Sequence, residues 1–466
     1  MSIRHALTLA AATMLALAAP AAAELKRPEQ MMIQTIDSEQ ERTVAMLAKW
    51  VNQNSGTMNF AGVKVVGDML RSELEPLDFK VEWIDIRAAN RAGHIVARHK
   101  GNGRGKKLLL IGHLDTVFEL DSPFQRWVRN GNDGEGPGAG DNKGGMAVII
   151  SALRAMKAAG TLKNADITVF LTGDEEDAGP VEISRRDLLA EGRKADVALD
   201  FEGLVRDAGP VAISRRDLIA DGKWADVALD FEGLVQDEGR DMGSVARRSS
   251  DEWQVTVTAR SGHSSGVFSP GAGYGAIYEL ARIVDTFRRE LPEDKLTYNV
   301  GLVGGGATTQ LGADKIRIAA TGKGNIIAAT AIARGDLRAI SSDQIARAQA
   351  KMQAIVAQPL NGAKATIEFA PDGYPPMAPT EANRALLARL NGVNRDMGLP
   401  EMGELDPVKR GAADISFVAQ DVDGLAGLGP ASRGDHAPGE TVDIASIFRQ
   451  AKRAAILMSR LAQERR

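Results

Sequence analysis

Apolar residues form two patterns along this chain, a helical periodicity and short continuous runs. Together these patterns predict alternating helices and buried strands. Residues 107–112 read K-L-L-L-I-G and residues 166–172 read D-I-T-V-F-L-T, so both are short apolar runs. Such runs are typical of strands covered on both faces in a parallel sheet. Residues 37–54 and 60–74 predict helices, and residues 146–159 predict the helix between the two strands. Strand, helix and strand in succession indicate an α/β sheet.

The pattern changes beyond residue 250, where strands and helices follow each other in the order β-α-β-β-α-β. The six elements are expected at residues 253–259, 271–290, 295–303, 325–338, 342–357 and 365–369. This order is the ferredoxin-like arrangement. Helices at residues 381–396 and 444–461 then resume the first domain. We therefore expect a main domain of residues 24–250 and 371–466 with a mixed, mostly parallel sheet, into which residues 251–370 are inserted as a separate domain.

A tandem repeat lies between the second buried strand and the inserted domain. Residues 177–206 and 207–236 are nearly identical, and each copy carries the sequence F-E-G, which contains Glu202 in the first copy and Glu232 in the second. Two copies are too few for a solenoid, which needs at least about three units to bury a shared core. Only one copy can occupy one position in the sheet. The other is expected to be an insertion at the surface.

Composition narrows the possible partners of this globular chain. The 466 residues are 44% hydrophobic, and the formal net charge is only -4. Acids and bases are therefore nearly balanced, which predicts no basic stripe for a phosphate backbone and no nucleic-acid partner. The chain contains no cysteine. This excludes disulfides and thiolate metal ligands.

Residues 1–23 are predicted to be a signal peptide. Arg4 and His5 precede an apolar run at residues 6–19, and three alanines at residues 21–23 precede Glu24. Small residues of this kind mark a cleavage site. The alternative is a membrane anchor, but the apolar run is shorter than the roughly 20 residues that a spanning helix needs. A secreted or periplasmic location follows, with no membrane association in the mature form.

Residues that can bind metal follow the predicted strands or lie in glycine-rich turns. They are His113 and Asp115 after the first buried strand, Asp141 in G-P-G-A-G-D-N-K-G-G, Glu175 and Glu176 after the second, and His436 in G-D-H-A-P-G-E. Ligands of α/β sheets bind at the carboxyl ends of the strands. Imidazoles and carboxylates without a thiolate suit two zinc ions that share one carboxylate. The alternatives are an ordinary glycine-rich turn and a solvated acidic loop.

Two pairs of these residues have a further interpretation. A carboxylate two residues after a histidine, as in His113-x-Asp115, can set the tautomer and orientation of a metal-binding imidazole. Neighbouring glutamates at a strand end point in different directions. One of Glu175 and Glu176 can therefore bind metal while the other serves as a base.

Seven short stretches of the chain together carry a resemblance to a known family. They are L-L-L-I-G-H-L-D-T-V-F, G-P-G-A-G-D-N-K-G-G, L-T-G-D-E-E, V-A-L-D-F-E-G, T-A-R-S-G-H-S-S-G, A-R-G-D-L-R-A and H-A-P-G-E-T-V-D. With these stretches the chain resembles the M20 family of dinuclear zinc peptidases and deacylases, above all its secreted glutamate carboxypeptidase branch. The stretches span almost the whole mature chain.

The resemblance implies a role for each candidate residue in a catalytic domain that binds two zinc ions. The zinc ligands would be His113, Asp141 as the bridge, Glu176, His436 and the glutamate of one F-E-G stretch. Glu175 would be the general base, Asp115 the partner of His113, and the Asp141-Asn142 peptide bond would be cis. Of the two F-E-G glutamates we favour Glu202, because it follows Glu176 through one short crossover, whereas Glu232 leads directly into the inserted domain.

The resemblance also makes the inserted domain a lid that forms a homodimer. His263 would reach the active site of the neighbouring subunit and hold the developing oxyanion, while Asn299 and Arg338 would contact the substrate. The alternatives are a plain loop histidine at position 263 and a surface salt bridge at Arg338.

The expected activity is hydrolysis of the amide bond beside a free carboxylate in a small peptide, with a glutamate-like leaving residue. A deacylase of N-acyl amino acids is the nearest alternative. A secreted binding protein is another, if the repeat disrupts the site.

Overall fold

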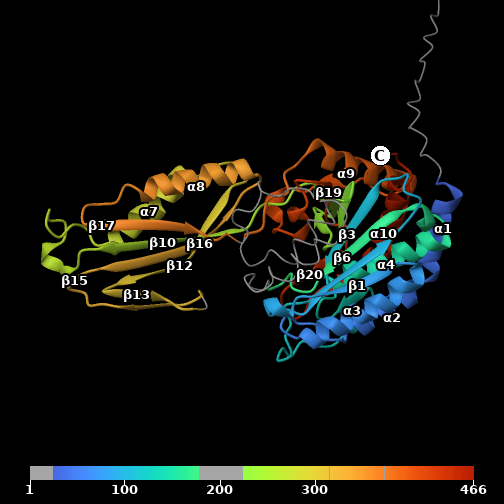
Figure 1. The fold of residues 1–466 in the computed structure, drawn as a ribbon, viewed down its shortest axis with the longest axis horizontal. Helices are drawn as coiled ribbons and strands as arrows, with labels where there is room; N and C mark the ends of the chain where they lie inside the picture. The colour runs from blue at the N-terminus through green and yellow to red at the C-terminus, as the bar shows by residue number, and fades with distance from the viewer. Residues whose placement is uncertain (1–24, 178–223, 314, 372, 466) are drawn as a thin grey trace, which may run out of the picture.

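The computed structural model describes residues 25–177, 224–313, 315–371 and 373–465, which form two lobes joined by two chain segments (Figure 1). The larger lobe contains a six-stranded sheet with the order β1-β2-β6-β3-β7-β19. Its strands are β1 (Lys80–Asp85), β2 (Gly93–His99), β3 (Lys107–His113), β6 (Asp166–Thr172), β7 (Val227–Asp230) and β19 (Asp423–Leu425). β2 runs antiparallel to both its neighbours, while β6, β3, β7 and β19 pair in parallel. The expected mixed, mostly parallel sheet is confirmed.

Helices pack on the sheet and on one another, and the central strands β3, β6 and β7 are buried on both faces. The helices are α1 (Arg27–Ser38), α2 (Gln40–Val51), α3 (Phe60–Leu74), α4 (Lys143–Ala158), α9 (Glu381–Asp396) and α10 (Ile444–Leu461). Leu108 and Leu110 of β3 belong to the large core that these helices share, whereas Leu109 and Ile111 belong to a smaller core on the opposite face. The alternation follows from the two-residue period of a strand. Helix α1 was not expected from the sequence.

The second copy of the repeat supplies one of the two strands that pair with β3, on the side opposite β6. Its residues Val227–Asp230 form β7, which lies between β3 and β19. The expectation that the second copy is the surplus one is therefore wrong. The residues that follow it directly, β8 (Val235–Asp237) and β9 (Arg240–Gly243), pair within the same lobe, and β9 also pairs with β18 (Gly403–Glu404). The pairing of β7 with both β3 and β19 places the second copy in the main sheet, while Glu202 lies outside the described residues.

The smaller lobe is an antiparallel sheet with the order β12-β16-β10-β17 (Figure 1). Its main elements are β10 (Asp251–Ala259), α7 (Ala276–Glu290), β12 (Thr297–Gly306), β16 (Thr330–Arg338), α8 (Ser342–Val356) and β17 (Ala363–Phe369). Trp253, Val255 and Val257 alternate along β10 into a core that also holds Ile283 and Phe287 of α7. The six elements have the expected order and nearly the expected bounds.

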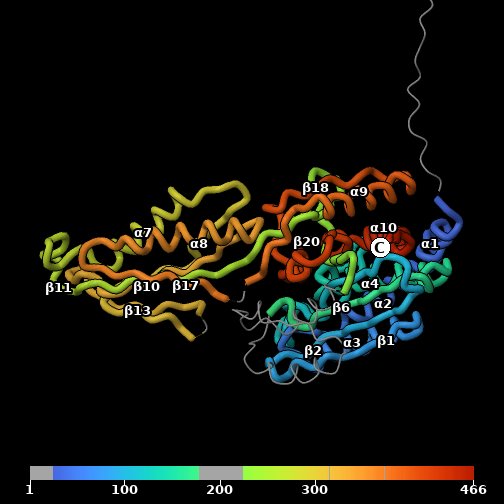
Figure 2. Tube along the Cα trace, turned by 45° about the horizontal axis from the view of Figure 1, so that its top comes forward, coloured from blue at the N-terminus to red at the C-terminus, as the bar shows by residue number. Residues whose placement is uncertain are grey.

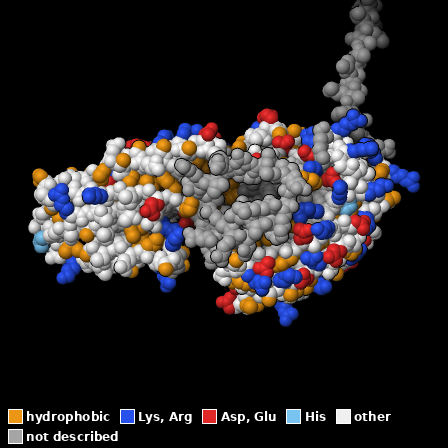
Figure 3. Space-filling view, viewed as in Figure 1, with side chains coloured by type: hydrophobic (Ala, Val, Ile, Leu, Met, Phe, Trp, Pro, Cys, Tyr) orange, Lys and Arg blue, Asp and Glu red, His pale blue; other side chains and the backbone are white. Residues whose placement is uncertain are grey.

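Short strands complete both lobes. They are β4 (Val128–Asn130), β5 (Asp133–Glu135), β11 (Gly262–His263), β13 (Thr308–Leu311), β14 (Ile318–Thr321), β15 (Ile326–Ile327), β20 (Ser432–Arg433) and β21 (Thr441–Asp443). β11 and β15 pair at the end of the smaller lobe that points away from the larger one (Figure 2). On the face drawn in Figure 3, acidic and basic side chains are interspersed over the described surface of the larger lobe. None of the described helices is both long and apolar enough to cross a membrane.

Two segments join the lobes, and they pair with each other. Arg247 and Met377 exchange both backbone hydrogen bonds at 2.9 Å, and Ser250 and Tyr374 exchange theirs at 3.0 Å. We call this antiparallel pair, residues 247–250 with 374–377, the connector ribbon.

Candidate metal centre

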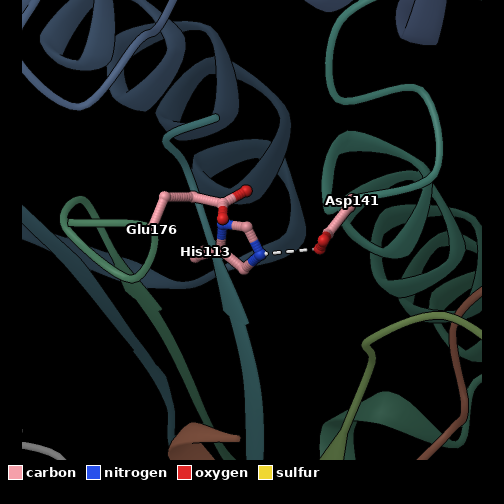
Figure 4. A group of neighbouring side chains, drawn as sticks. All are labelled: His113, Asp141 and Glu176. Atoms are coloured by element: carbon pink, nitrogen blue, oxygen red, sulfur yellow. Dashed lines mark hydrogen bonds and ion pairs between the residues drawn. The ribbon is translucent and has the colours of Figure 1, made fainter. Parts of the chain in front are cut away.

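The Asp141 carboxylate lies between two histidines. Its Oδ1 is 3.0 Å from His113 Nε2, and its Oδ2 is 3.2 Å from His436 Nε2. His113 ends β3, and Asp141 precedes α4, as Figure 4 shows for these two residues. Each oxygen of one carboxylate therefore faces a different imidazole. This is the arrangement that a carboxylate bridging two cations requires.

A small sheet brings the turn of Asp141 and the loop of His436 together. β5 lies just before the glycine-rich turn, and β21 lies just after the loop of His436. The two strands pair antiparallel, with Glu135 opposite Thr441. Residues almost 300 positions apart in the chain thereby meet at one side of the main sheet.

Glu176 completes a cluster at the carboxyl end of the main sheet. One ligand atom each of His113, Asp141 and Glu176 lies within 4.8 Å of the others (Figure 4). Oε2 of Glu176 is also 3.2 Å from His436 Nε2. Four of the predicted ligands therefore meet in one place.

The buried carboxylate of Asp115 organises the loop that carries both glutamates. It accepts hydrogen bonds from the backbone N–H groups of Glu175 and Glu176, both at 3.1 Å, and from the Thr57 hydroxyl at 2.7 Å. Its Oδ1 lies 3.4 Å from Nδ1 of His113. Asp115 therefore positions the predicted base as well as the histidine. The sequence predicts only the second of these roles.

Glu440 holds the turn of Asp141, a role that is not expected from the sequence. Its Oε1 accepts hydrogen bonds from the backbone N–H groups of Gly140 at 2.8 Å and Asp141 at 2.9 Å, and its Oε2 accepts one from Gly138 at 3.1 Å. Glu440 is buried. Its position four residues after His436 was the only available signal, because its partners lie far away in the chain. The Asp141-Asn142 peptide bond in this turn is cis, as the resemblance implied.

The electrostatics of the cluster reflect a crowd of acids around two imidazoles. Hydrogen bonds to Asp141 and Glu176 raise the pKa of His436 to about 11. Burial lowers the pKa of His113, but its interactions with Asp115 and Asp141 outweigh burial and raise that pKa well above its ordinary value. Burial also raises the pKa of Glu176. Cations bound here would compete with protons for these imidazoles and carboxylates.

Glu175 lies beside this cluster and has a different partner. The Tyr374 hydroxyl is 3.2 Å from Oε1 of Glu175 and 3.4 Å from its backbone oxygen. Burial raises the pKa of the Glu175 carboxyl well above its ordinary value, and the nearby carboxylates of Asp414 and Glu232 raise it further, while His113 opposes them. A carboxyl group tuned in this way and not engaged with the histidines has the properties of an acid-base group. Tyr374 was not expected from the sequence.

Glu232 follows β7 and is buried beside two arginines that the sequence analysis did not single out. Its Oε2 accepts a hydrogen bond from Arg247 Nη2 at 2.9 Å and lies 3.6 Å from Arg410 Nη2. Asp230, at the end of the same strand, accepts the backbone N–H of Glu232 at 3.1 Å. β7 lies directly beside β3. Glu232 is thus at the same end of the sheet as His113.

The predicted residues of the smaller lobe do not join this cluster within one chain. His263 belongs to β11, at the remote end of that lobe, and is exposed (Figure 2). Asn299 lies on β12, opposite Asp336 of β16. Arg338 ends β16 and its Nε donates to Asp336 at 2.7 Å, so the salt bridge weighed as its alternative exists.

A family model decides what this constellation belongs to. The model of Peptidase family M20/M25/M40 matches residues 109–460, which include every predicted site residue. The chain belongs to this family. Carboxypeptidase G2 of Pseudomonas sp. (strain RS-16) is 34% identical over 194 residues, which are 41% of this chain and 45% of that protein. Succinyl-diaminopimelate desuccinylase of Delftia acidovorans is 31% identical over 144 residues, 29% of this chain and 36% of that protein. Each match thus spans less than half of the relative's own length.

Solved structures share the fold of this M20 chain. Aminopeptidase PepT from Bacillus cereus superimposes with a TM-score of 0.65 at 16% identity, over 91% of this chain and 99% of that one. A dinuclear metal binding peptidase of the M20 family from Bacillus subtilis superimposes with a TM-score of 0.59 at 14% identity, over 92% and 99% of the two chains. At these identities the likeness shows the fold alone.

The donor atoms of the M20 centre fit divalent metal ions. Two imidazoles and two carboxylates converge, and one of the carboxylates presents its two oxygens to different imidazoles. Such nitrogen and oxygen donors suit zinc and other divalent first-row metals. The carboxylates of Glu440 and Asp115 accept hydrogen bonds from backbone N–H groups of the ligand loops and hold these loops in place. Supports of this kind orient metal ligands in many metalloenzymes.

Proposed function

We propose that this chain is a secreted or periplasmic zinc-dependent exopeptidase that hydrolyses the amide bond beside a C-terminal, glutamate-like residue. The observation that carries the proposal is the position of the Asp141 carboxylate between His113 and His436. Glu175 lies beside this cluster and accepts a hydrogen bond from Tyr374 instead. The likeness to carboxypeptidase G2 supports a carboxypeptidase activity. The substrate class is a small peptide with a free carboxylate.

In this proposal two zinc ions bind per chain. His113 and Glu232 would hold one ion, His436 and Glu176 the other, and Asp141 both. Glu232 replaces the expected Glu202 in this ligand set, because it follows β7, which pairs with β3 in the main sheet. When bound, the zinc ions supply Lewis acidity, which polarises a carbonyl and lowers the pKa of water.

The chain's own residues then move the proton and orient the substrate. A carboxylate oxygen of Glu175 accepts the proton of the attacking water and passes it to the nitrogen of the leaving amino acid, so that no charge is left on the amine. Asp115 keeps the Glu175 backbone in place for this transfer. Asn299 and Arg338 contact either the free carboxylate of the substrate or the tetrahedral oxygen. His263 of a second copy donates a hydrogen bond to the oxyanion.

The second candidate is a deacylase of N-acyl amino acids, favoured by the likeness to succinyl-diaminopimelate desuccinylase. Zinc content per chain, measured together with hydrolysis of matched dipeptides and N-acyl amino acids, tests both. We expect two zinc ions and fastest cleavage before a C-terminal glutamate. Cleavage of N-acyl amino acids alone would establish the deacylase, whereas a folded protein without zinc or activity would indicate a binding protein.

A further prediction concerns the proposed homodimer. His263→Ala is expected to lose most activity, because in this proposal His263 holds the oxyanion in the site of the neighbouring subunit. Within one chain His263 lies remote from the cluster. Mixing it with Glu175→Gln should restore part of the activity, since a mixed two-fold dimer has one site with both groups intact. The measurement is turnover after mixing, with subunit exchange followed by labelled chains. Exchange without recovery would contradict a role in the neighbouring site.

A further inference from the structure

The connector ribbon is bonded to the smaller lobe as well as within itself. The Ser249 backbone N–H donates to the Ala339 oxygen at 2.7 Å, and the Ala339 N–H donates to the Ser249 hydroxyl at 3.0 Å. The Ala370 N–H donates to the Glu252 oxygen at 2.8 Å. The ribbon thereby continues β10 and β17 and takes its orientation from their sheet. A change in the orientation of this lobe would be transmitted to the ribbon.

One strand of the ribbon carries a side chain to the proposed base. The Tyr374 hydroxyl lies 3.2 Å from Oε1 of Glu175. Its ring packs against Phe417, with ring centres 5.1 Å apart and planes at 55°. The ring is therefore held from the side while its hydroxyl meets the carboxylate. A carboxylate with one oxygen engaged in this way keeps the other for a proton from water.

The other strand carries a side chain to the proposed metal ligand. Arg247 is buried, and its Nη2 donates to Glu232 Oε2 at 2.9 Å. Its guanidinium also donates to the backbone oxygens of Gly411 at 2.8 Å and Ala412 at 2.7 Å. Because a guanidinium is planar and rigid, three such bonds leave it one orientation. Glu232 is thus held by one oxygen, and its other oxygen is left for a cation.

The same arginine also faces Asp230. Arg247 Nη1 and Asp230 Oδ2 are 3.6 Å apart, and both are buried without a hydrogen-bond partner among the described residues. A buried polar atom without a hydrogen bond is costly, so an approach of these two atoms to hydrogen-bond distance would be favourable. The guanidinium can therefore serve two carboxylates at the end of β7.

We propose that the connector ribbon is a positioning element for the reaction, in which Tyr374 holds the base Glu175 and Arg247 holds the metal ligand Glu232. The inference rests on the proposed function, since it assigns both side chains to that site. It makes the catalytic carboxylates dependent on the segment that joins the lobes. Neither residue touches the reacting atoms, so both are positioning residues and act through their partners.

Tyr374→Phe tests the first half, because it removes only the hydroxyl. A hydrogen bond to a charged group is worth about a 10- to 100-fold change in rate, which is the expected fall in kcat, with KM and zinc content unchanged. Tyr298→Phe is the matched control, since that hydroxyl donates to the backbone oxygen of Arg288 in the other lobe. It should leave kcat unaltered. A rise in KM with an unchanged kcat would overturn the assignment.

A double variant separates positioning from general structural damage. If Tyr374 acts through Glu175, adding Tyr374→Phe to Glu175→Gln should cost nothing further, because the group that it positions is already gone. An equal loss in both backgrounds would overturn the proposal. A parent protein that cleaves none of the test substrates would instead refute the proposed function, so the two failures are distinguishable.

Arg247→Lys tests the second half through zinc affinity, measured by competition with a chelator. Lysine keeps the charge but cannot bond Glu232 and two backbone oxygens together. Supports of metal ligands typically contribute 10- to 100-fold to affinity, so a loss of about that size is expected for one zinc ion. Arg389→Lys, which alters an ion pair with Glu464, is the control. An unchanged affinity in Arg247→Lys would remove Arg247 from the proposal.

Discussion

Glu175→Gln is expected to keep both zinc ions and to lose about 100- to 10,000-fold in turnover, the usual contribution of general acid-base catalysis. Glu175 is set apart from the histidines, and its carboxylate meets Tyr374. The amide cannot accept a proton from water, but it has nearly the same size. The measurements are zinc per chain and kcat on a peptide with a C-terminal glutamate.

Glu401→Gln provides the control for this variant. Glu401 is exposed and forms an ion pair with Arg395 in the last turn of α9. It should behave like the parent. Loss of zinc from Glu175→Gln would show that Glu175 is a ligand, and the role of base would then have to pass to another group.

Glu232→Ala is expected to lose one zinc ion and the activity, whereas Glu202→Ala should stay close to the parent. The chain itself offers this matched pair, because both glutamates stand in the same V-A-L-D-F-E-G sequence. Glu232 follows β7, which pairs with β3, whereas Glu202 lies outside the described residues. Removing a true ligand leaves the ion with too few donors. Zinc stoichiometry and activity of the two purified variants check this prediction.

Deletion of residues 177–206 extends the comparison. The deletion joins Glu176 to Asp207 and keeps the copy that contains β7, so a folded and active protein is expected. If Glu202→Ala is inactive and Glu232→Ala is active, the first copy holds the metal and the assignment made here is wrong. If only the double variant is inactive, either copy can fill the position beside β3.

Most of the secondary structure could be predicted from the sequence. The helices at residues 60–74, 381–396 and 444–461 have the predicted bounds, and both buried strands lie where their apolar runs are. Hydrophobic periodicity is a local property of the sequence, so it can be recognised without knowledge of the fold. Helix α1 was missed. Its apolar residues Met32 and Ile36 contact the core, but they are too few to outweigh the polar residues around them.

The gathering of the site could also be predicted in part. His113 and Glu176 follow neighbouring parallel strands, whose carboxyl ends meet at one edge of the sheet, and the resemblance added Asp141 and His436. The smaller lobe was different. The pattern gave its strands but not where His263 lies relative to the cluster, because that depends on how a whole lobe is joined to the other.

The sequence by itself determined the elements, the donor types and the family, because each is written in short stretches of chain. Only the tertiary structure decided which copy of the repeat lies beside β3, since both copies contain the same V-A-L-D-F-E-G sequence and a local pattern cannot choose between them. It also decided the parts played by Glu440, Tyr374 and Arg247. Glu440 binds backbone groups about 300 residues away, and Tyr374 meets a carboxylate 199 residues away. Such contacts depend on the packing of whole lobes and leave no periodic signal near the residues that make them.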